Sequence, residues 1–327
     1  MHSYTVTPET IEGLASSWPE WRQRLQCELF VLPWWLKVWC RSFGSGENPH
    51  LLAVRDGGSI IGIAPLLRRD NTVCFAGNSD VCDYQDFIVA QDNKHDFFDT
   101  LLRHLGQEGI RRLDLRPLRP DSTVMSVLTD MARSRGYQVS CKQEDVSLES
   151  DLPGTWEEYL DGLTGKQRHE LTRKLRKLAA AGAINYRLLQ GDEAAGSAFD
   201  AFLTQFRESR TDKATFLTPD MEAFFRALAR ASAEAQVLRL GVLELDKLMV
   251  AAVMCFDYND EMYLYNSGFD ARYRSLSVGL ISKAYCIRAC IEQKKRRFNF
   301  LKGDEEYKYH LGGKEVPISS CEIILNG

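Results

Sequence analysis

The sequence predicts an α+β protein of two similar domains in tandem, each with a mixed, mostly antiparallel sheet flanked by helices. The chain of 327 residues has room for two ordinary domains. Each half contains a meander of three short strands, preceded by helical segments and followed by a loop, an amphipathic helix and a further strand. One large α+β domain, in which the order of elements repeats by coincidence, is the alternative.

The meander of the first half is made of three apolar runs, at residues 50–56, 59–67 and 72–77. Turn signals separate them at Asp56-Gly57-Gly58 and at Asp70-Asn71. The flanking elements are a helix at 32–43, an amphipathic helix at 95–107 and a strand at 110–117. We expect residues 1–150 to form this first domain.

The second half repeats this order. Its strands are expected at residues 237–245, 248–258 and 261–268, with turns at Asp246-Lys247 and Asn259-Asp260. The flanking elements are helices at 198–210 and 220–234, an amphipathic helix at 279–293 and a strand at 296–303. We expect residues 151–327 to form this second domain.

A basic helix is predicted between the halves. Leu171, Leu175 and Leu178 mark one buried helical face. The other faces carry Lys166, Arg168, Arg173, Lys174, Arg176 and Lys177. This surface is either simply solvated or a contact for phosphate or another anion.

Composition limits the classes of partner. The apolar content of 44%, the charged content of 26% and the net charge of -4 are those of an ordinary globular protein without global attraction to nucleic acid or anionic membranes. The nine cysteines form no CxxC pair and sit mostly in apolar runs, as reduced core thiols do. No signal peptide, membrane span or metal-ligand spacing is recognisable, so we expect a cytoplasmic protein without a metal.

The loop after the second meander has the composition of an anion cradle. Two arginines and several small residues precede a helix, where free N–H groups and the helix dipole favour phosphate. The residues concerned are Arg272, Arg274, Ser275, Ser277, Val278, Gly279 and Leu280. A serine N-cap with a glycine for tight packing is the alternative.

The corresponding loop of the first half, residues 77–92, is acidic. It carries Asp80, Asp83, Asp86 and Asp92 and no basic residue. Such a loop repels phosphate, so we expect Asp83, Tyr84 and Asp86 to face a cationic or hydroxyl-rich substrate. The alternative is that these carboxylates cap turns or face water.

These features resemble the acyl-CoA-binding core of the GNAT acyltransferases. Residues 274–279, "RSLSVG", fit the R/Q-x-x-G-x-G/A loop of that family with Ser277 in place of the first glycine. The tandem halves look like the Fem-related branch, and more closely like the CelD/BcsL-type proteins associated with bacterial envelope and exopolysaccharide genes. The stretches that carry this likeness are "PWWLKVW", "IGIAPLL", "DYQDF", "KQRHELTRKLRKL", "FRESRTDKATFLT", "YLYNSGFDARYRSLSVG" and "FNFLKGDEEYKYHLG".

The resemblance implies a catalytic role for the segment after Gly303, which would lie in a cleft between the halves. Amine attack on a thioester needs a base, for which Asp304 or Glu305 is suitable, and Tyr307 can donate to the departing thiolate. His169 and His310 are further bases, and the alternative is a solvated turn. The expected substrate contacts outside the acidic loop are Arg168, Arg207, Arg210 and Lys308.

The implied activity is N-acyl transfer from acyl-CoA to an amine by direct attack, with O-acylation next. The acceptor would be a small amine such as an amino-sugar, an amino-lipid or an envelope precursor. One alternative is a Fem-type ligase that takes aminoacyl groups from tRNA. Another is a catalytically inactive module that binds an anionic glycan or nucleic acid through residues 166–177. Acyl chain length, acceptor and oligomeric state stay open.

Overall fold

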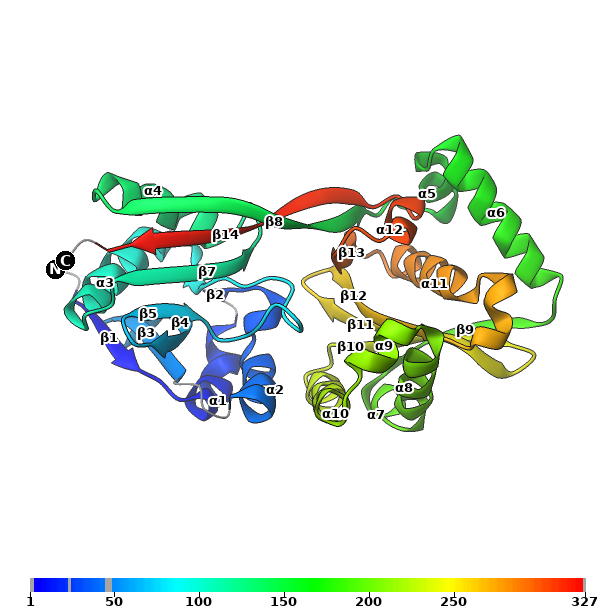
Figure 1. Ribbon diagram of the computed structural model, residues 1–327, viewed down its shortest axis with the longest axis horizontal. Helices are drawn as coiled ribbons and strands as arrows, with labels where there is room; N and C mark the ends of the chain where they lie inside the picture. The colour runs from blue at the N-terminus through cyan, green and yellow to red at the C-terminus, as the bar shows by residue number, and fades with distance from the viewer. Residues whose placement is uncertain (1–2, 23–24, 45–48, 326–327) are drawn as a thin grey trace. The chain divides into compact units, whose positions relative to one another are not determined.

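The computed structural model of the chain describes residues 3–22, 25–44 and 49–325. It divides into two compact units. Unit 1 contains the residues up to Asp145 together with those from Val316 onward, and unit 2 contains Val146–Glu315. Figure 1 traces both through their element labels.

The sheet of unit 1 has the strand order β1-β3-β4-β5-β7-β14-β8. These strands are β1 (Tyr4–Pro8), β3 (Pro49–Asp56), β4 (Ser59–Arg69), β5 (Thr72–Phe75), β7 (Arg112–Leu118), β8 (Gln138–Asp151) and β14 (Lys314–Ile324). Strands β3, β4 and β5 are the expected meander, paired antiparallel, while β5 and β7 pair in parallel. Short strands β2 (Leu25–Gln26) and β6 (Ile88–Ala90) pair at the side, β6 also against β4.

Helical segments flank these strands in unit 1. They are α1 (Ile11–Trp21), η1 (Leu29–Val31), α2 (Pro33–Phe43), η2 (Gln91–Asn93), α3 (Lys94–Gln107), η3 (Val124–Leu128) and α4 (Thr129–Ser134). Helix α3 contributes Phe97 and Phe98 to the core, where both rings pack edge-on against Phe87. A Cβ at Gly62 of β4 would lie 2.3 Å from the Phe97 ring, so this close approach requires glycine.

The sheet of unit 2 has the order β8-β13-β12-β11-β10-β9. Its strands are the end of β8, β9 (Ile184–Gln190), β10 (Leu238–Leu245), β11 (Leu248–Tyr258), β12 (Glu261–Phe269) and β13 (Arg297–Lys302). The pairs β9–β10, β10–β11 and β11–β12 are antiparallel. Both hairpin turns are as expected, because Asp246, Lys247, Asn259 and Asp260 all have positive φ, as type I′ turns require.

Strands β12 and β13 pair in parallel over a short stretch, Glu261–Tyr263 with Arg297–Asn299. Strand β12 then continues to Phe269, with a bulge where Leu264 and Asn266 oppose Cys255 and Met254. The β13 edge is also irregular, because its register against β8 shifts between Asn299 and Leu301. The two strands therefore share only the first part of their length.

Helices cover both faces of the unit 2 sheet (Figure 1). They are α5 (Trp156–Gly162), α6 (Gly165–Ala179), α7 (Gly191–Ala195), α8 (Ser197–Ser209), α9 (Thr211–Phe216), α10 (Pro219–Glu234), η4 (Ala271–Leu276), α11 (Val278–Glu292) and α12 (Glu306–His310). Helix α11 packs on one face, and α8 and α10 lie on the other. Helix α8 lies so close to β12 that a Cβ at Gly268 would be 2.4 Å from the Phe206 nitrogen.

The repeated order of strands and helices predicted from the sequence is confirmed. The last strand differs from the expected division at residue 150: its residues from Val316 onward belong to unit 1. There β14 pairs antiparallel with β7, and Cys321 and Ile323 join the core beside Leu113 and Leu115. A C-terminal strand carries no local signal for which of two similar sheets it joins.

Among the residues that the structure describes, no helix has the length and apolar character needed to cross a membrane.

Candidate functional site

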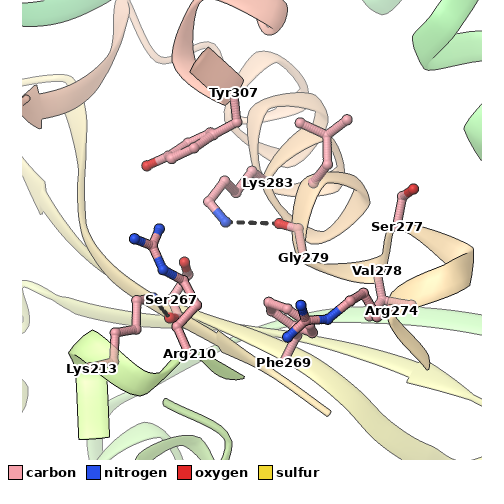
Figure 2. Close-up of a pocket in the computed structure, with 11 residues that line it drawn as sticks. Arg210, Lys213, Ser267, Phe269, Arg274, Ser277, Val278, Gly279, Lys283 and Tyr307 are labelled. Atoms are coloured by element: carbon pink, nitrogen blue, oxygen red, sulfur yellow. Dashed lines mark hydrogen bonds between the residues drawn. The ribbon is translucent and has the colours of Figure 1, made fainter. Parts of the chain in front are cut away.

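A pocket of about 250 Å³ opens at the N-terminus of α11, within unit 2. Figure 2 shows its walls, which come from α9, the end of β12, the start of α11 and α12. The lining residues are Arg210, Lys213, Ser267, Phe269, Arg274, Ser277, Val278, Gly279, Leu280, Lys283 and Tyr307.

The first turn of α11 presents backbone N–H groups toward this pocket. Ser277 precedes the helix in the left-handed conformation, with φ 57° and ψ 32°, and its side chain makes no capping bond. The N–H groups of Leu280 and Ile281 both bond to the Ser277 carbonyl at 3.0 Å. The N–H groups of Val278 and Gly279 precede this bonding and have no acceptor within the helix. This turn is therefore a candidate anion site.

Phe269 and Arg274 form the wall beside that turn. A Cβ at Gly279 would lie 2.9 Å from Phe269 Cδ1, so glycine allows the ring to close against the helix. The Arg274 guanidinium lies 5.6 Å from the centre of the Phe269 ring and donates to the Ser209 carbonyl at 3.1 Å. Packing thus positions a cation next to the free N–H groups.

Two lysines with lowered pKa values, Lys213 and Lys283, also line the pocket. Burial, followed by the nearby charge of Lys213, lowers the pKa of Lys283 to about 7. Burial, followed by the charge of Arg210, lowers the pKa of Lys213 to about 8. Both lysines therefore titrate close to neutral pH.

The bonds of these lysines leave donors available. Lys283 Nζ donates to the Gly279 carbonyl at 2.8 Å and lies 4.7 Å from the centre of the Tyr307 ring. Lys213 Nζ donates to the Ser267 carbonyl and lies 4.8 Å from the centre of the Phe206 ring. An ammonium group has three N–H donors, so each lysine can bind a further acceptor.

Of the predicted cofactor residues, the structure places five on this pocket: Arg274, Ser277, Val278, Gly279 and Leu280. The other two lie elsewhere. The Arg272 side chain is 84% exposed and paired with Asp270 at 2.6 Å, and Lys177 donates to the Ser275 carbonyl at 2.8 Å. Arg272 is thus held by its neighbour, and Ser275 offers the pocket no side chain.

Of the predicted catalytic residues, Tyr307 lines the pocket and the others do not. Burial raises the pKa of Tyr307, so its hydroxyl stays protonated. Asp304 and Glu305 precede α12 and are exposed, and Glu305 pairs with Lys308 at 2.8 Å. His169 is exposed on α6.

Lys308 does not fit the predicted role of substrate ligand. It is buried, and its ammonium donates to three carbonyls, those of Leu301 at 3.0 Å, Lys302 at 2.6 Å and Gly303 at 3.0 Å. These three bonds account for its three N–H donors, and the ion pair with Glu305 adds charge compensation. Lys308 instead fixes the turn between β13 and α12.

Of the predicted arginine contacts, Arg210 alone lines the pocket; it also pairs with Asp212 at 2.9 Å. Arg207 pairs with Glu222 at 2.5 Å, and Arg168 pairs with Asp161 at 2.7 Å. Arg168 also lines a shallow groove of about 540 Å³ along α6, together with Gly165, His169, Thr172, Arg173 and Arg176.

In unit 1, two predicted substrate residues are part of the interior. Tyr84 is fully buried, with the Arg119 guanidinium 4.9 Å from its ring centre. Asp86 is 6% exposed and accepts from the N–H and hydroxyl of Thr123, both at 2.6 Å. The expectation that they face a substrate is corrected, because Asp86 caps the start of η3 while Tyr84 packs. Asp83 is half-buried and stays a prediction.

Sequence reasoning assigned no role to Ser267, Phe269 or Lys283, which line the pocket, and included Lys213 only as part of a polar stretch that could face a substrate. One signal was available for Lys283: a lone lysine in the otherwise apolar run "VGLISKAYCI" of a helix buried on most sides. For Lys213 the sequence shows only a polar stretch. Its burial depends on how α9 packs and is not visible locally.

Comparison with known protein families matches the part of the chain that contains this pocket. A family model described as "Acetyltransferase (GNAT) domain" matches residues 165–309. The fold is that of a GNAT acetyltransferase domain. No curated protein sequence matches the chain significantly.

Solved structures extend the likeness to both units. FemX superposes with a TM-score of 0.64 at 12% identity, covering 98% of each chain. A conserved protein of unknown function from Bacteroides thetaiotaomicron gives 0.60 at 10% identity, over 99% of this chain and 100% of that one. The C-terminal domain of a putative lysylphosphatidylglycerol synthetase from Agrobacterium fabrum gives 0.52 at 12% identity over 82% of each. At these identities the likeness concerns the GNAT fold alone.

Proposed function

We propose that the protein is an acyl-CoA-dependent N-acyltransferase whose active site is the pocket at the N-terminus of α11. One observation carries the proposal. The free N–H groups after Ser277 and the cation of Arg274 border the same pocket, at the end of β12. A pyrophosphate needs such a cradle, and the matched GNAT domain includes it.

The pyrophosphate of CoA would bind the N–H groups of Val278 and Gly279, while Leu280 lines the pocket beside them. The positive end of the α11 dipole favours its charge, and Arg274 adds a charge-assisted bond. Arg272 is exposed and reaches this position only by leaving Asp270. We therefore assign Arg272 a weaker role than Arg274.

The pantetheine and the thioester would follow the edge of β12 beyond Tyr263, where its pairing with β13 ends. An extended chain can add to such an edge through backbone hydrogen bonds. Ser267 and Phe269 line the pocket at the end of this strand. This path brings the thioester toward Tyr307 on the opposite wall.

The chemical step would be direct attack of the acceptor amine on the thioester carbonyl. The new C–N bond forms as the C–S bond breaks, the amine proton passes to Glu305 or Asp304, and Tyr307 gives a proton to the CoA thiolate. The high pKa of Tyr307 suits a donor that is protonated at the start. We favour Glu305, because its charge already acts on Lys213 and Lys283.

The sequence resemblance supports a finer assignment to the CelD/BcsL-type branch, with an amino-sugar, amino-lipid or cell-envelope precursor as acceptor in a bacterial cytoplasm. The synthetase named above carries a lipid in its own name, which agrees with an envelope acceptor.

A Fem-type, tRNA-dependent ligase is the second candidate. The cationic groove on α6, with Arg168, Arg173 and Arg176, supports it, since such a surface suits a phosphate backbone. This reading predicts binding that weakens steeply with salt and transfer from charged tRNA instead of CoA.

Titration calorimetry with CoA, acetyl-CoA and a long-chain acyl-CoA tests the proposal. We expect saturable binding of CoA itself, and amine-dependent release of free thiol from at least one acyl-CoA. If the protein binds none of the three but transfers an aminoacyl group from tRNA, the second candidate replaces the first.

A further inference from the structure

The unit 2 pocket is lined by four cationic side chains: Arg210, Lys213, Arg274 and Lys283. Among the described residues that line it, none is an aspartate or glutamate. Figure 2 shows Lys283 entering from α11, and Arg210 and Lys213 from the side of α9. The pyrophosphate cradle involves Arg274, so Arg210, Lys213 and Lys283 remain available in the same pocket for a second anionic group.

Lys283 is costly to bury as a cation, and Lys213 is half-buried. Lys283 is 6% exposed, and its ammonium is bound by a neutral carbonyl and an aromatic face. Each lysine lacks a carboxylate within ion-pair distance among the described residues. Two like charges in a desolvated site disfavour each other unless an anion enters or a proton leaves.

The groups around Lys283 do not provide that anion. Lys213 acts on it as a like charge, while Glu305 and the buried Cys255 and Cys286 raise its pKa by less than burial lowers it. The Glu305 carboxylate pairs with Lys308 at 2.8 Å and is not within ion-pair distance of Lys283. The pocket thus contains an uncompensated pair of ammonium groups.

We propose that Lys213 and Lys283 bind a carboxylate carried by one of the two transfer substrates, either at the end of the acyl chain or on the acceptor amine. The identity of the substrate that carries the carboxylate rests on the proposed acyl transfer. The proposal that the two lysines bind an anion does not. A single negative charge suits the two lysines, because Lys283 is buried beside a like charge from Lys213 and has no ion-pair partner among the described residues. A donor that is a dicarboxylic monothioester, or an acceptor that is an amino acid, has the required chemistry.

The first experiment observes the lysines directly and needs no CoA. Protein labelled with 13C at lysine Cε is titrated with pH in the presence of succinate, and again in chloride at equal ionic strength. The K213M and K283M variants assign the two signals. We expect succinate to raise the pKa of both lysines by about one pH unit, because an anion that binds the charged form tenfold more tightly has that effect. Unchanged titration of both lysines overturns the carboxylate site.

The second experiment identifies the carrier. Calorimetry compares succinyl-CoA with butyryl-CoA, and turnover with acetyl-CoA compares glycine with ethylamine. A preference of about tenfold or more for the carboxylate-bearing partner in one comparison, lost in K213M and retained in K213R, identifies that partner. Absence of a preference in both comparisons overturns the assignment to a substrate. The K247M variant, in an exposed turn, controls for general loss of positive charge.

Failure of the inference and failure of the proposed function give different results. If CoA binds but succinate leaves both lysines unchanged, the acyl transfer stands and the carboxylate site is wrong. If the lysines respond to succinate but CoA does not bind, the anion site stands and the acyl-CoA proposal is wrong.

Discussion

The loop after the meander of unit 1 and the loop after the meander of unit 2 hold the same place in the order of elements but use their polar residues differently. In unit 1, Tyr84 and Asp86 are turned into the interior, where Asp86 caps η3. In unit 2, the loop ends at Ser277 in the left-handed conformation, and the turn after it borders a pocket. Repetition of the fold therefore does not repeat the chemistry: one loop stabilises its unit, while the other forms a candidate site.

The largest expected effect concerns the proposed proton transfer in unit 2. Glu305→Gln removes the proposed base with little change of shape and should lower kcat by about a hundredfold to ten-thousandfold. Steady-state kinetics with saturating acyl-CoA measures it. The matched control is Glu306→Gln, next along the chain, whose carboxylate is 87% exposed and should be dispensable.

Parental kcat in Glu305→Gln, with CoA affinity and melting temperature retained, would move the role of base to Asp304. If Asp304→Asn is also fully active, neither carboxylate carries the proton transfer, and His310 and His169 become the next bases to test.

The next effect concerns the cradle. Gly279→Asp introduces negative charge at the helix N-terminus and should weaken CoA binding by about a hundredfold or more. Gly279→Ala is the control: its Cβ only requires the Phe269 ring to move, so it should lose much less. Equal affinities for the two variants by calorimetry, with parental circular dichroism, would show that phosphate binds elsewhere.

The fold was readable from the sequence where signals are local. The hairpins follow from apolar runs joined by Asp246-Lys247 and Asn259-Asp260, which adopt the positive φ expected of them. Five of the residues that line the pocket were predicted to lie together as well, because arginine, small residues and a helix start have a recognisable spacing. These features depend on neighbours within a few residues.

The rest of the site depends on contacts between distant segments. Lys283 gains its lowered pKa from burial and from Lys213, which is far away in the chain. Asp86 looked exposed in an acidic loop, but it meets Thr123 only once η3 packs beside it. Lys308 was expected to contact the substrate, yet it binds the carbonyls of the turn after β13. Composition shows the residue type in each case, and tertiary packing decides its role.

A smaller effect tests the structural role in unit 1. Asp86→Asn replaces an acceptor of Thr123 N–H and O–H by an amide that can accept through one atom only. We expect a loss of about 1–3 kcal/mol in the free energy of unfolding, measured by denaturant titration, with unchanged CoA affinity. Weakened CoA binding in the folded variant would contradict the division of roles between the two loops.

The same residue predicts a pH dependence. Burial raises the pKa of Asp86 to about 6, above its ordinary value of 3.8. The folded state therefore holds the proton more tightly, and the stability from this group is full below about pH 4 and lost as the pH rises to about 6. The difference in the free energy of unfolding between the wild type and Asp86→Asn should fall across this pH window. A difference that rises with pH there has the wrong sign for a carboxylate whose pKa burial raises.

The smallest effect concerns Ser277. Its left-handed conformation is one that glycine adopts freely, so Ser277→Gly should change the free energy of unfolding by less than about 1 kcal/mol and leave CoA affinity intact. Thermal melting and calorimetry check this pair of results. A large loss of affinity would assign a ligand bond to the serine hydroxyl, beyond the backbone role given to it above.

Hydrogen exchange with mass spectrometry tests the central claim most directly, because it follows both loops in one sample. On addition of CoA, peptides that cover Arg274–Lys283 should exchange more slowly, since the N–H groups of the first turn of α11 become bonded to phosphate. Peptides that cover Asn78–Phe87 should not change. Protection of the unit 1 loop with no change at α11 would contradict the account.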